Sequence, residues 1–354
     1  MRSGNTSERP IRVLMVTAGW PSSQAQTTHF IKRQAEFLQA AGIDVDVFHF
    51  RGGQKFRNYV TAWARVRSRL AAGRYDLVHA QFGQSGVLAL PKRMPLVVTL
   101  RGDDLQGIID DGNARITLKG RILRRLSRWV ASRADAVIIV SDHMRTFLDP
   151  AVRAHVIPSG LDLASFRVIP RDEARRHLGL PEHKRLVLFG GNPACLRKRF
   201  ALARDAVELL KQSGGPPTEL IIAWGVPHSD MPYYMNACDA LVFTSMQEGS
   251  PNVVKEALAC NLPVVSVPVG DVPTRLQGVT ASELCVDERP ETIAAALARV
   301  LHTPQRSNGR ETVMQLDENV ITAKVIGVYK SVLTPTPQVA LPIGYPSSDR
   351  PIAL

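Results

Sequence analysis

The chain has 354 residues, of which 45% are hydrophobic and 21% are charged, a composition typical of globular proteins and not of disordered or fibrous ones. The formal net charge is +12, and residues 51–133 carry this whole excess, with 17 Lys and Arg against five Asp and no Glu. No apolar run approaches the roughly 20 residues that span a bilayer, and the polar first ten residues lack the apolar segment of a secretion signal. We therefore expect a cytoplasmic protein whose first half faces something anionic.

The four cysteines are scattered through the second half without Cys-x-x-Cys spacing. This pattern favours buried thiols in a reducing compartment over a zinc site or a set of disulfides. We expect neither a metal nor a cofactor.

Short apolar runs alternate with amphipathic stretches, which is typical of parallel sheets with crossover helices. In the first half the expected strands are 11–18, 45–50, 77–82, 96–100 and 136–141, and the expected helices are 29–41, 56–72 and 116–131. The second half restarts the pattern with strands 186–190, 220–224, 240–244, 263–267 and 284–286 and helices 199–211, 252–260 and 291–301. Two such sets in series predict an α/β fold of two Rossmann-like domains that face each other across a cleft.

A hinge is expected near residues 157–166, where Pro158, Ser159 and Gly160 interrupt the pattern. The resulting division is a first domain of residues 1–165 and a second domain of residues 166–318. A last helix, 319–332, is expected to return and pack on the first domain. Residues 333–354 are rich in Pro and Ser and predict a flexible tail.

The most informative stretch follows the expected strand 240–244. Ser250 is a good N-cap and Pro251 suits the first helical position, so a helix is expected to begin there. The backbone N–H groups of Asn252 and Val253 would then point out of the helix end into the crevice beyond the strands, a place that binds anionic or sugar-phosphate groups.

Glu248 and Glu256 lie eight positions apart around this helix start. Two carboxylates suit a polyhydroxyl ligand because each can accept paired hydroxyl protons. Gly249 would let a ligand approach the backbone closely. A bare Glu-x₇-Glu spacing is common by chance, and without its setting a loop acid and a solvated helix residue would be the better explanation.

In this setting the sequence resembles the retaining glycosyltransferases of the GT-B fold, family 4. Glu248 and Glu256 match the family's Glu-x₇-Glu signature, and the segment EGSPNVVKEALACNLPVVS is similar to members that build bacterial exopolysaccharide or teichuronic-type wall polymers. The segments VSDHMRTFL, HVIPSGLDLASF and RDEARRHLGLP agree with this resemblance, which covers roughly residues 11–332.

The resemblance implies a donor site in the second domain. Glu256 would bind the ribose hydroxyls of a nucleotide, Glu248 would contact hydroxyls of the donor sugar, and the amides of residues 250–253 would hold sugar or phosphate. Arg197 and Lys198 would neutralise the diphosphate, where negative charge develops as the glycosidic bond breaks.

Two further features of this domain concern the same site. Val226 and Pro227 would line the pocket for the base. Arg199 stands where the family usually has Gly. An ordinary basic helix start exposed to solvent is the alternative explanation for the cations at 197 and 198.

The first domain departs from the family pattern. Relatives often carry His-Gly-x-Asp after the fourth strand, whereas this chain has Arg101-Gly102-Asp103-Asp104. An arginine cannot act as a neutral imidazole does, so Arg101 is expected to help hold the diphosphate or an anionic acceptor. Asp104 matches the motif's aspartate. We count Arg101 and Asp104, with Glu248, as catalytic candidates; an internal ion pair that braces the loop is the alternative.

The stretch LKGRILRRLSRWV predicts a basic amphipathic helix, which suits an anionic membrane surface. A helix that packs on the core and solvates its polar face is the alternative. Its apolar face would carry Ile122, Leu126, Trp129 and Val130, and its cations would be Arg121, Arg124, Arg125 and Arg128.

The function expected from the resemblance is transfer of a sugar from a UDP- or GDP-linked nucleotide-sugar to a growing, lipid-linked glycan, with retained configuration and no protein nucleophile. This activity predicts a protein that is peripheral on the inner face of the plasma membrane. A nucleotide-sugar-binding module with weak catalysis is the first alternative, motivated by Arg101. A nucleic-acid-binding protein is the second, and the lack of an aromatic stacking motif argues against it.

Overall fold

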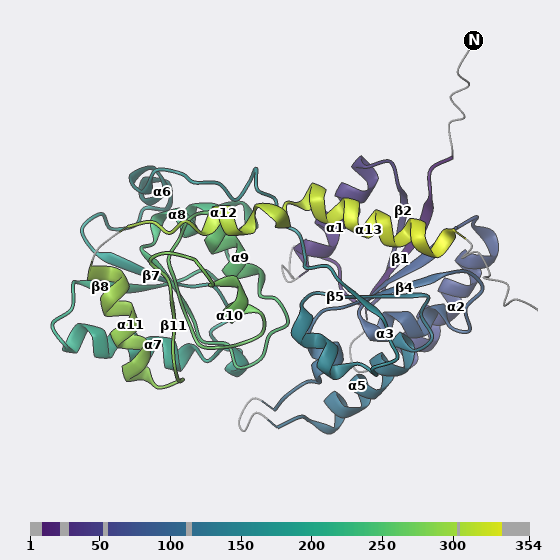
Figure 1. Ribbon diagram of the computed structural model, residues 1–354, viewed down its shortest axis with the longest axis horizontal. Coiled ribbons are helices and arrows are strands. Elements are labelled where there is room, and N and C mark those ends of the chain that lie inside the picture. Colours follow the sequence, from purple (N-terminus) through teal and green to yellow (C-terminus); the bar gives the residue numbers. More distant parts are fainter. Residues whose placement is uncertain (1–8, 22–27, 52–55, 111–114, 303–304, 335–354) are drawn as a thin grey trace, which may run out of the picture.

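The computed structural model describes residues 9–21, 28–51, 56–110, 115–302 and 305–334. Two parallel sheets, each covered by helices, form two α/β domains that lie side by side (Figure 1). This is the GT-B arrangement that the sequence predicts. The proposed tail lies outside the described residues from 335 onwards.

The first domain is built on a six-stranded sheet with the order β2-β1-β3-β4-β5-β6. Its strands are β1 Arg12–Thr17, β2 Asp44–His49, β3 Leu77–Gln81, β4 Leu96–Leu100, β5 Ala136–Ile139 and β6 Ala154–Val156. Its helices are α1 His29–Ala40, α2 Phe56–Ala72, α3 Gly83–Gly86, α4 Asp103–Gln106 and α5 Leu118–Ala131. Every residue of β3 and β4 is buried, as in parallel strands covered on both faces.

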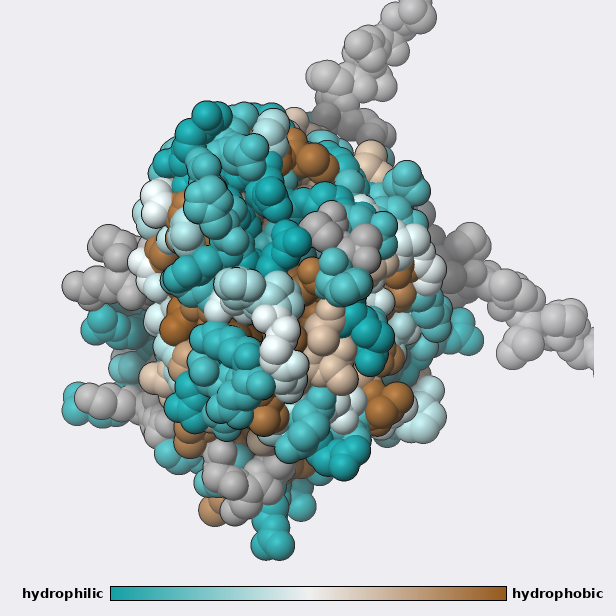
Figure 2. Space-filling view, turned by 90° about the vertical axis from the view of Figure 1, so that its left-hand side faces the viewer, coloured by the Kyte–Doolittle hydropathy of each residue, from teal (hydrophilic) through white to brown (hydrophobic). Residues whose placement is uncertain are grey.

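The second domain is built on a five-stranded sheet with the order β11-β10-β9-β7-β8. Its strands are β7 Arg185–Phe189, β8 Thr218–Ile222, β9 Ala240–Phe243, β10 Val264–Ser266 and β11 Glu283–Leu284. Its helices are α6 Arg171–Leu178, α7 Phe200–Gln212, α8 Met231–Ala237, α9 Asn252–Ala259, α10 Val272–Arg275, α11 Pro290–His302 and α12 Gly309–Val313. The end of this domain that lies farthest from the first domain is shown in Figure 2, where hydrophobic residues form small groups scattered among hydrophilic ones.

The chain crosses between the domains twice, and the two crossings are hydrogen-bonded to each other. The first crossing follows β6, and the second leads into α13, Glu318–Leu333, which packs against α1 (Figure 1). The Leu161 amide donates to the Leu316 carbonyl and the Glu318 amide donates to the Leu161 carbonyl, both at 2.8 Å. We propose the domain boundary at residues 165 and 166, just after this paired segment.

Buried charged side chains from both domains donate hydrogen bonds to the first crossing. Arg33 on α1 pairs with Glu318 at 2.9 Å and donates to the Gly160 carbonyl at 2.8 Å. Lys255 on α9 donates to the Ser159 carbonyl at 2.9 Å. Burial lowers the pKa of Lys255 to about 7 and raises the pKa of Glu318. The crossing therefore depends on polar groups held in a nearly dry environment.

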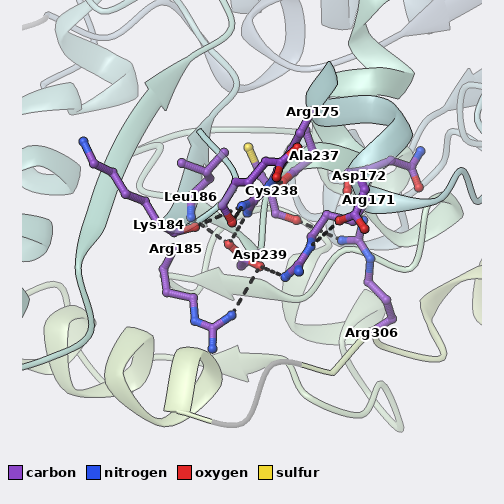
Figure 3. Close-up of polar contacts among 12 residues, drawn as sticks. Arg171, Asp172, Arg175, Lys184, Arg185, Leu186, Ala237, Cys238, Asp239 and Arg306 are labelled. Atoms are coloured by element: carbon purple, nitrogen blue, oxygen red, sulfur yellow. Dashed lines mark hydrogen bonds and ion pairs between the residues drawn. The ribbon is translucent and has the colours of Figure 1, made fainter. Parts of the chain in front are cut away.

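A second buried polar cluster lies in the second domain, at the edge where β7 and β9 begin (Figure 3). Arg175 on α6 pairs with Asp239 at 2.8 Å and donates to the carbonyls of Ala237, Pro181, Glu182 and Lys184. Asp239 also accepts from the Leu186 amide at 2.7 Å. These bonds fix α6 and the starts of two strands in one place.

Candidate active site

A cavity of about 630 Å³ lies between the two domains. Its walls include the residues that follow β3, β4 and β5 in the first domain and β7, β8 and β9 in the second. Ligands bind at this edge of open parallel sheets because helix starts and loops converge there. The cavity is therefore the natural place for the chemistry.

Two cations enter this cavity from the short segment after β7. Lys198 Nζ lies 2.6 Å from Glu248 Oε1, and Arg197 donates to Asp103 at 3.2 Å and to the Gln247 carbonyl at 3.0 Å. Burial opposes the charge of Arg197, but the carboxylates of Asp103 and Glu248 outweigh it and raise the pKa of Arg197. Both cations line the cavity, where an anion can reach them.

The next residue, Arg199, has φ of +51°, in the left-handed region that favours glycine. This backbone conformation explains why a glycine would fit there. Its side chain donates to the Thr244 carbonyl at 2.6 Å and pairs with Glu288, so it fastens the loop after β9.

Glu256 lines the cavity from inside α9 and is 8% exposed. Burial raises the pKa of Glu256, and the nearby Arg33, Lys255 and His29 partly oppose this rise. Glu248 lies in the loop before the helix, and its carbonyl accepts from Gln106 of the first domain at 3.0 Å. The two carboxylates thus border one cavity, which is the arrangement that the sequence predicts for a polyhydroxyl ligand.

The start of α9 differs from the sequence prediction. The helix begins at Asn252 with Pro251 at the N-cap position, and the Ser250 hydroxyl donates to Asp271 at 2.8 Å in place of capping the helix. The reason is a tertiary partner, a carboxylate from α10's N-cap that competes for the hydroxyl. Asn252 and Val253 line the cavity, and Asn252 Oδ1 is buried with no hydrogen-bond partner among the residues that the structure describes.

Gly249 lines the cavity, and its backbone also contacts the opposite domain. A Cβ atom at this position would overlap the carbonyl oxygen of Arg101 in the opposite domain. The Ser141 hydroxyl donates to the Gly249 carbonyl at 3.0 Å, again from the first domain. The missing side chain therefore lets the two domains meet backbone to backbone.

The comparison with known families agrees with this geometry. Residues 8–160 match the family model described as "Glycosyl transferase 4-like domain", and residues 174–303 match the one described as "Glycosyl transferases group 1". The chain belongs to glycosyltransferase family 4. It is a retaining, nucleotide-sugar-dependent glycosyltransferase of the GT-B fold.

Two relatives illustrate the family. The chain is 26% identical over 358 residues to a Bacillus subtilis protein named as the teichuronic acid biosynthesis glycosyltransferase TuaC, over 82% of this chain and 90% of the relative. It is 30% identical over 286 residues to a D-inositol 3-phosphate glycosyltransferase of Salinispora arenicola, over 67% of this chain and 63% of the relative.

Among solved structures, a sucrose-phosphate synthase from Thermosynechococcus elongatus superposes with a TM-score of 0.76 at 19% identity, over 91% of this chain and 99% of that one. Anabaena HepE in complex with UDP superposes with a TM-score of 0.64 at 18% identity, over 91% and 100%. At these identities the two structures support the fold alone.

In this family 4 chain, Arg101 stands where the sequence resemblance expects a histidine, and it lines the same cavity. Its guanidinium donates to Ser159 of the crossing and to Gln81 at 2.8 Å, and it lies 4.6 Å from the centre of the Phe30 ring. Burial lowers the pKa of Arg101 to about 10, so it stays protonated at neutral pH. Arg101 Nε is buried without a partner within the described part of the chain.

Asp104 does not have the surroundings of a catalytic group. It is 3% exposed, and its carboxylate accepts from the backbone amides of Arg101, Gly102 and Gly83. This geometry supports the bracing role that the sequence left open, although the brace consists of backbone amides and not of an ion pair with Arg101.

Several cavity residues were missed by sequence reasoning. Asp103, His29, Arg33 and His228 all line the cavity, and the rings of His29 and His228 meet across the cleft at 4.7 Å. Only Asp103 had a usable signal, because it follows β4 directly and therefore had to lie at the ligand-binding edge. The others reach the site through tertiary packing.

The remaining predicted residues lie in two places. Val226, which follows β8, lines the same cavity. Arg121, Arg125 and Arg128 are exposed on α5, and Arg124 is partly buried. The apolar face of α5 is not the predicted one, because Val130 is buried and Leu126 is half-buried, while the exposed apolar side chains are Leu118, Ile122 and Trp129. Within the described residues, no helix is long and apolar enough to cross a membrane.

Proposed function

We propose that the protein moves a sugar from a UDP- or GDP-linked donor to a growing, lipid-linked glycan in cell-surface polysaccharide biosynthesis. The observation that carries the proposal is the cavity of about 630 Å³, called the donor cavity below. It brings together two cations, two carboxylates and a helix start without a side-chain cap. The names of the relatives, a teichuronic acid transferase and a structure in complex with UDP, support this direction.

Each group in the cavity has a proposed role that follows from its chemistry. Glu256 accepts the ribose hydroxyls, and Glu248 accepts hydroxyls of the donor sugar. Arg197 and Lys198 hold the diphosphate together with the amides of Asn252 and Val253. Val226 contacts the base, and Ser250 supports the loop through its bond to Asp271.

The chemical step that these roles support needs no protein nucleophile. As the bond from the sugar to the diphosphate breaks, negative charge grows on the leaving oxygens, and fixed cations stabilise this charge more in the transition state than in the ground state. The leaving phosphate can then take the proton of the acceptor hydroxyl on the same face, which gives retained configuration.

A panel of UDP- and GDP-sugars tests the donor site. We expect one of them to raise the thermal stability of the protein and to release nucleotide slowly in the presence of a membrane lipid extract. Glu256→Ala should remove both effects, because the ribose loses its acceptor. The matched control is Glu208→Ala, which removes an exposed carboxylate from α7 and should change neither.

A binding module with weak catalysis remains the second candidate, and Arg101 in place of the histidine is the observation that favours it. Its signature in the same assay is stabilisation by a nucleotide-sugar without any release of nucleotide, whatever acceptor is added. Salt-sensitive DNA binding without a response to nucleotides would contradict both candidates.

We further propose that α5 holds the protein on the inner face of the plasma membrane, as a peripheral cytoplasmic enzyme. Leu118, Ile122 and Trp129 lie at helical spacing on one outward face and are 71%, 57% and 43% exposed. Exposed cations flank this face at Arg121, Arg125 and Arg128. Apolar side chains among cations suit an anionic lipid surface, where each cation contributes about 1 kcal/mol.

Cosedimentation with phosphatidylglycerol vesicles tests this membrane surface. Replacing Arg121, Arg125 and Arg128 together with Gln should lower binding by about tenfold or more. A matched triple change of exposed arginines in the second domain, Arg204, Arg289 and Arg299, should leave binding nearly unchanged. Equal losses in the two triple variants would contradict a specific role of α5.

A further inference from the structure

A second cavity, of about 380 Å³, opens beside the donor cavity. The two cavities share lining residues, so a ligand in one would lie next to a ligand in the other. The shared residues are Phe82, Arg101, Asp103, Arg197, Glu248 and Gly249. The volume falls within the range of about 300–1,000 Å³ that small-molecule sites occupy.

Asp103 is the acidic residue of the first domain at this junction. Its Oδ1 accepts from Arg197 and from Gln247, both at 3.2 Å, and 43% of its side chain is exposed. The carboxylate of its neighbour Asp104 accepts hydrogen bonds from three backbone amides, so the two adjacent aspartates have different roles. Asp103 therefore presents acceptor oxygens at the point where the cavities meet.

The rest of the second cavity suits one class of ligand. Gln84 lines it, and Gln84 Oε1 is buried with no partner among the described residues, so it can accept a hydroxyl proton. Phe82 stands at the junction with φ of +72°, a conformation that non-glycine residues adopt at a cost in energy and mostly at functional sites. Ile108 and Leu123 form an apolar edge.

Polar acceptors with an aromatic ring and an apolar edge fit a saccharide that carries an apolar group. A sugar ring offers hydroxyls on its rim and an apolar face for an aromatic side chain. Leu123 belongs to α5, so the apolar edge of the cavity continues into the helix that carries the exposed Leu118, Ile122 and Trp129.

We propose that the second cavity binds the acceptor saccharide and that Asp103 holds the hydroxyl next to the reacting one, while the lipid-linked end leaves past Ile108 and Leu123. This proposal rests on the proposed function and assigns its acceptor site.

The transfer then balances without any further reactant. The acceptor oxygen forms a bond to the anomeric carbon of the donor, and the bond from that carbon to the diphosphate breaks with its electron pair on the diphosphate oxygen. The hydroxyl proton moves to the leaving phosphate. Asp103 orients the acceptor by accepting a hydrogen bond from the neighbouring hydroxyl, which leaves the proton of the reacting hydroxyl free to move to the phosphate. Arg197, which contacts Asp103, places the reacting hydroxyl next to the diphosphate.

Octyl glycosides serve as the probe, because each joins a saccharide to an apolar chain. Wild-type protein is saturated with the nucleotide that stabilises it, and saturation-transfer NMR then measures glycoside binding across a panel of hexosides. We expect at least one to bind. Asp103→Asn should weaken that binding by about tenfold or more, because a neutral amide replaces a charged hydrogen-bond acceptor.

Gln84→Leu provides a second and independent variant. It removes a buried carbonyl oxygen that has no partner, so the protein should be at least as stable as wild type while its affinity for the glycoside falls. The matched control is Asp149→Asn, an exposed aspartate of the same domain outside both cavities, which should leave glycoside affinity unchanged.

The outcomes separate the acceptor site from the donor site. Absence of nucleotide binding would refute the proposed function itself. Nucleotide binding without glycoside binding, or glycoside binding that is equal in wild type, Asp103→Asn and Gln84→Leu, would overturn the acceptor site and leave the donor site intact.

Discussion

Two charged clusters in the second domain use buried polar groups in opposite ways. In the Asp239 cluster, comprising Arg175 and Asp239, the guanidinium donates to four carbonyls and one carboxylate (Figure 3). In the donor cluster, comprising Arg197, Lys198, Glu248, Asn252 and Glu256, the side chains border a cavity and Asn252 Oδ1 has no partner within the described chain. Satisfied groups stabilise the fold, whereas groups left unsatisfied beside a cavity indicate a ligand.

The largest expected effect is a loss of stability when a substitution breaks the Asp239 cluster. Arg175→Met should lower the free energy of unfolding by about 3–5 kcal/mol, because it removes the buried cation nearest to Asp239 and the donor to four carbonyls. Urea denaturation measures this change. Arg171→Met is the control, since Arg171 is exposed and contacts Asp239 only at 3.4 Å, and its removal should cost less than about 1 kcal/mol. Similar losses in both variants would show that Arg175 has no special role.

The next effect is on catalysis and changes the donor cluster. Lys198→Met should lower kcat by about 10²–10³, or about 3–4 kcal/mol, because charge on the leaving diphosphate loses its neutralising group. Stability should change little, since the lysine lies beside a cavity. Steady-state kinetics with the donor found by the panel measures the effect. Lys211→Met, which removes an exposed lysine of α7, should keep the wild-type kcat.

A smaller effect separates binding from stability at one residue. Glu256→Gln should weaken nucleotide affinity by about 10- to 100-fold, because hydrogen bonds to a charged group are lost. The ligand-free variant should be at least as stable as wild type at pH 7. The pKa of Glu256 is raised in the fold, so the folded state opposes its charge above that pKa, and the neutral amide removes this opposition. Titration calorimetry and urea denaturation test the two halves separately.

The same pKa predicts a pH dependence of nucleotide binding. The ionised carboxylate accepts the ribose hydroxyls, so affinity should fall as the pH drops through the raised pKa of Glu256, which lies above the usual 4.5. His29 faces the same cavity with a lowered pKa and gains charge in the acid range. The informative quantity is therefore the ratio of wild-type to Glu256→Gln affinity, and a ratio independent of pH between 4 and 7 would contradict the assignment.

The smallest effect concerns the backbone that supports the donor cluster. Arg199→Gly and Arg199→Ala lose the same bonds to Thr244 and Glu288, but only Gly is relaxed at φ of +51°. We expect the Gly variant to be more stable than the Ala variant by about 1 kcal/mol. Thermal denaturation of the pair measures the difference, and an Ala variant as stable as the Gly variant would exclude backbone strain at this position.

Sequence reasoning predicted the two sheets well because parallel strands buried on both faces are continuous apolar runs. It missed β6, α6 and α8, which have three, eight and seven residues and carry too little periodic pattern to be recognised. The donor cluster could be predicted because its members lie close together in two segments of the chain. Asp103 could have been predicted, because it follows β4, but His29 and His228 could not, since only the docking of one domain on the other brings them together at the cavity. The error at Ser250 arises within one domain, from a partner twenty-one positions away in the sequence.

The paired crossings between the domains determine how the cleft can open. A single linker would allow one domain to swivel, slide or tilt against the other. Two crossings that are hydrogen-bonded side by side at Leu161, Leu316 and Glu318 favour a hinge motion about the paired segment over a swivel or a slide. Gly249 and the Arg101 carbonyl meet across the cleft, one from each domain. Folding about the paired crossings would therefore part this backbone contact and open the two proposed substrate cavities, which share wall residues, in one movement.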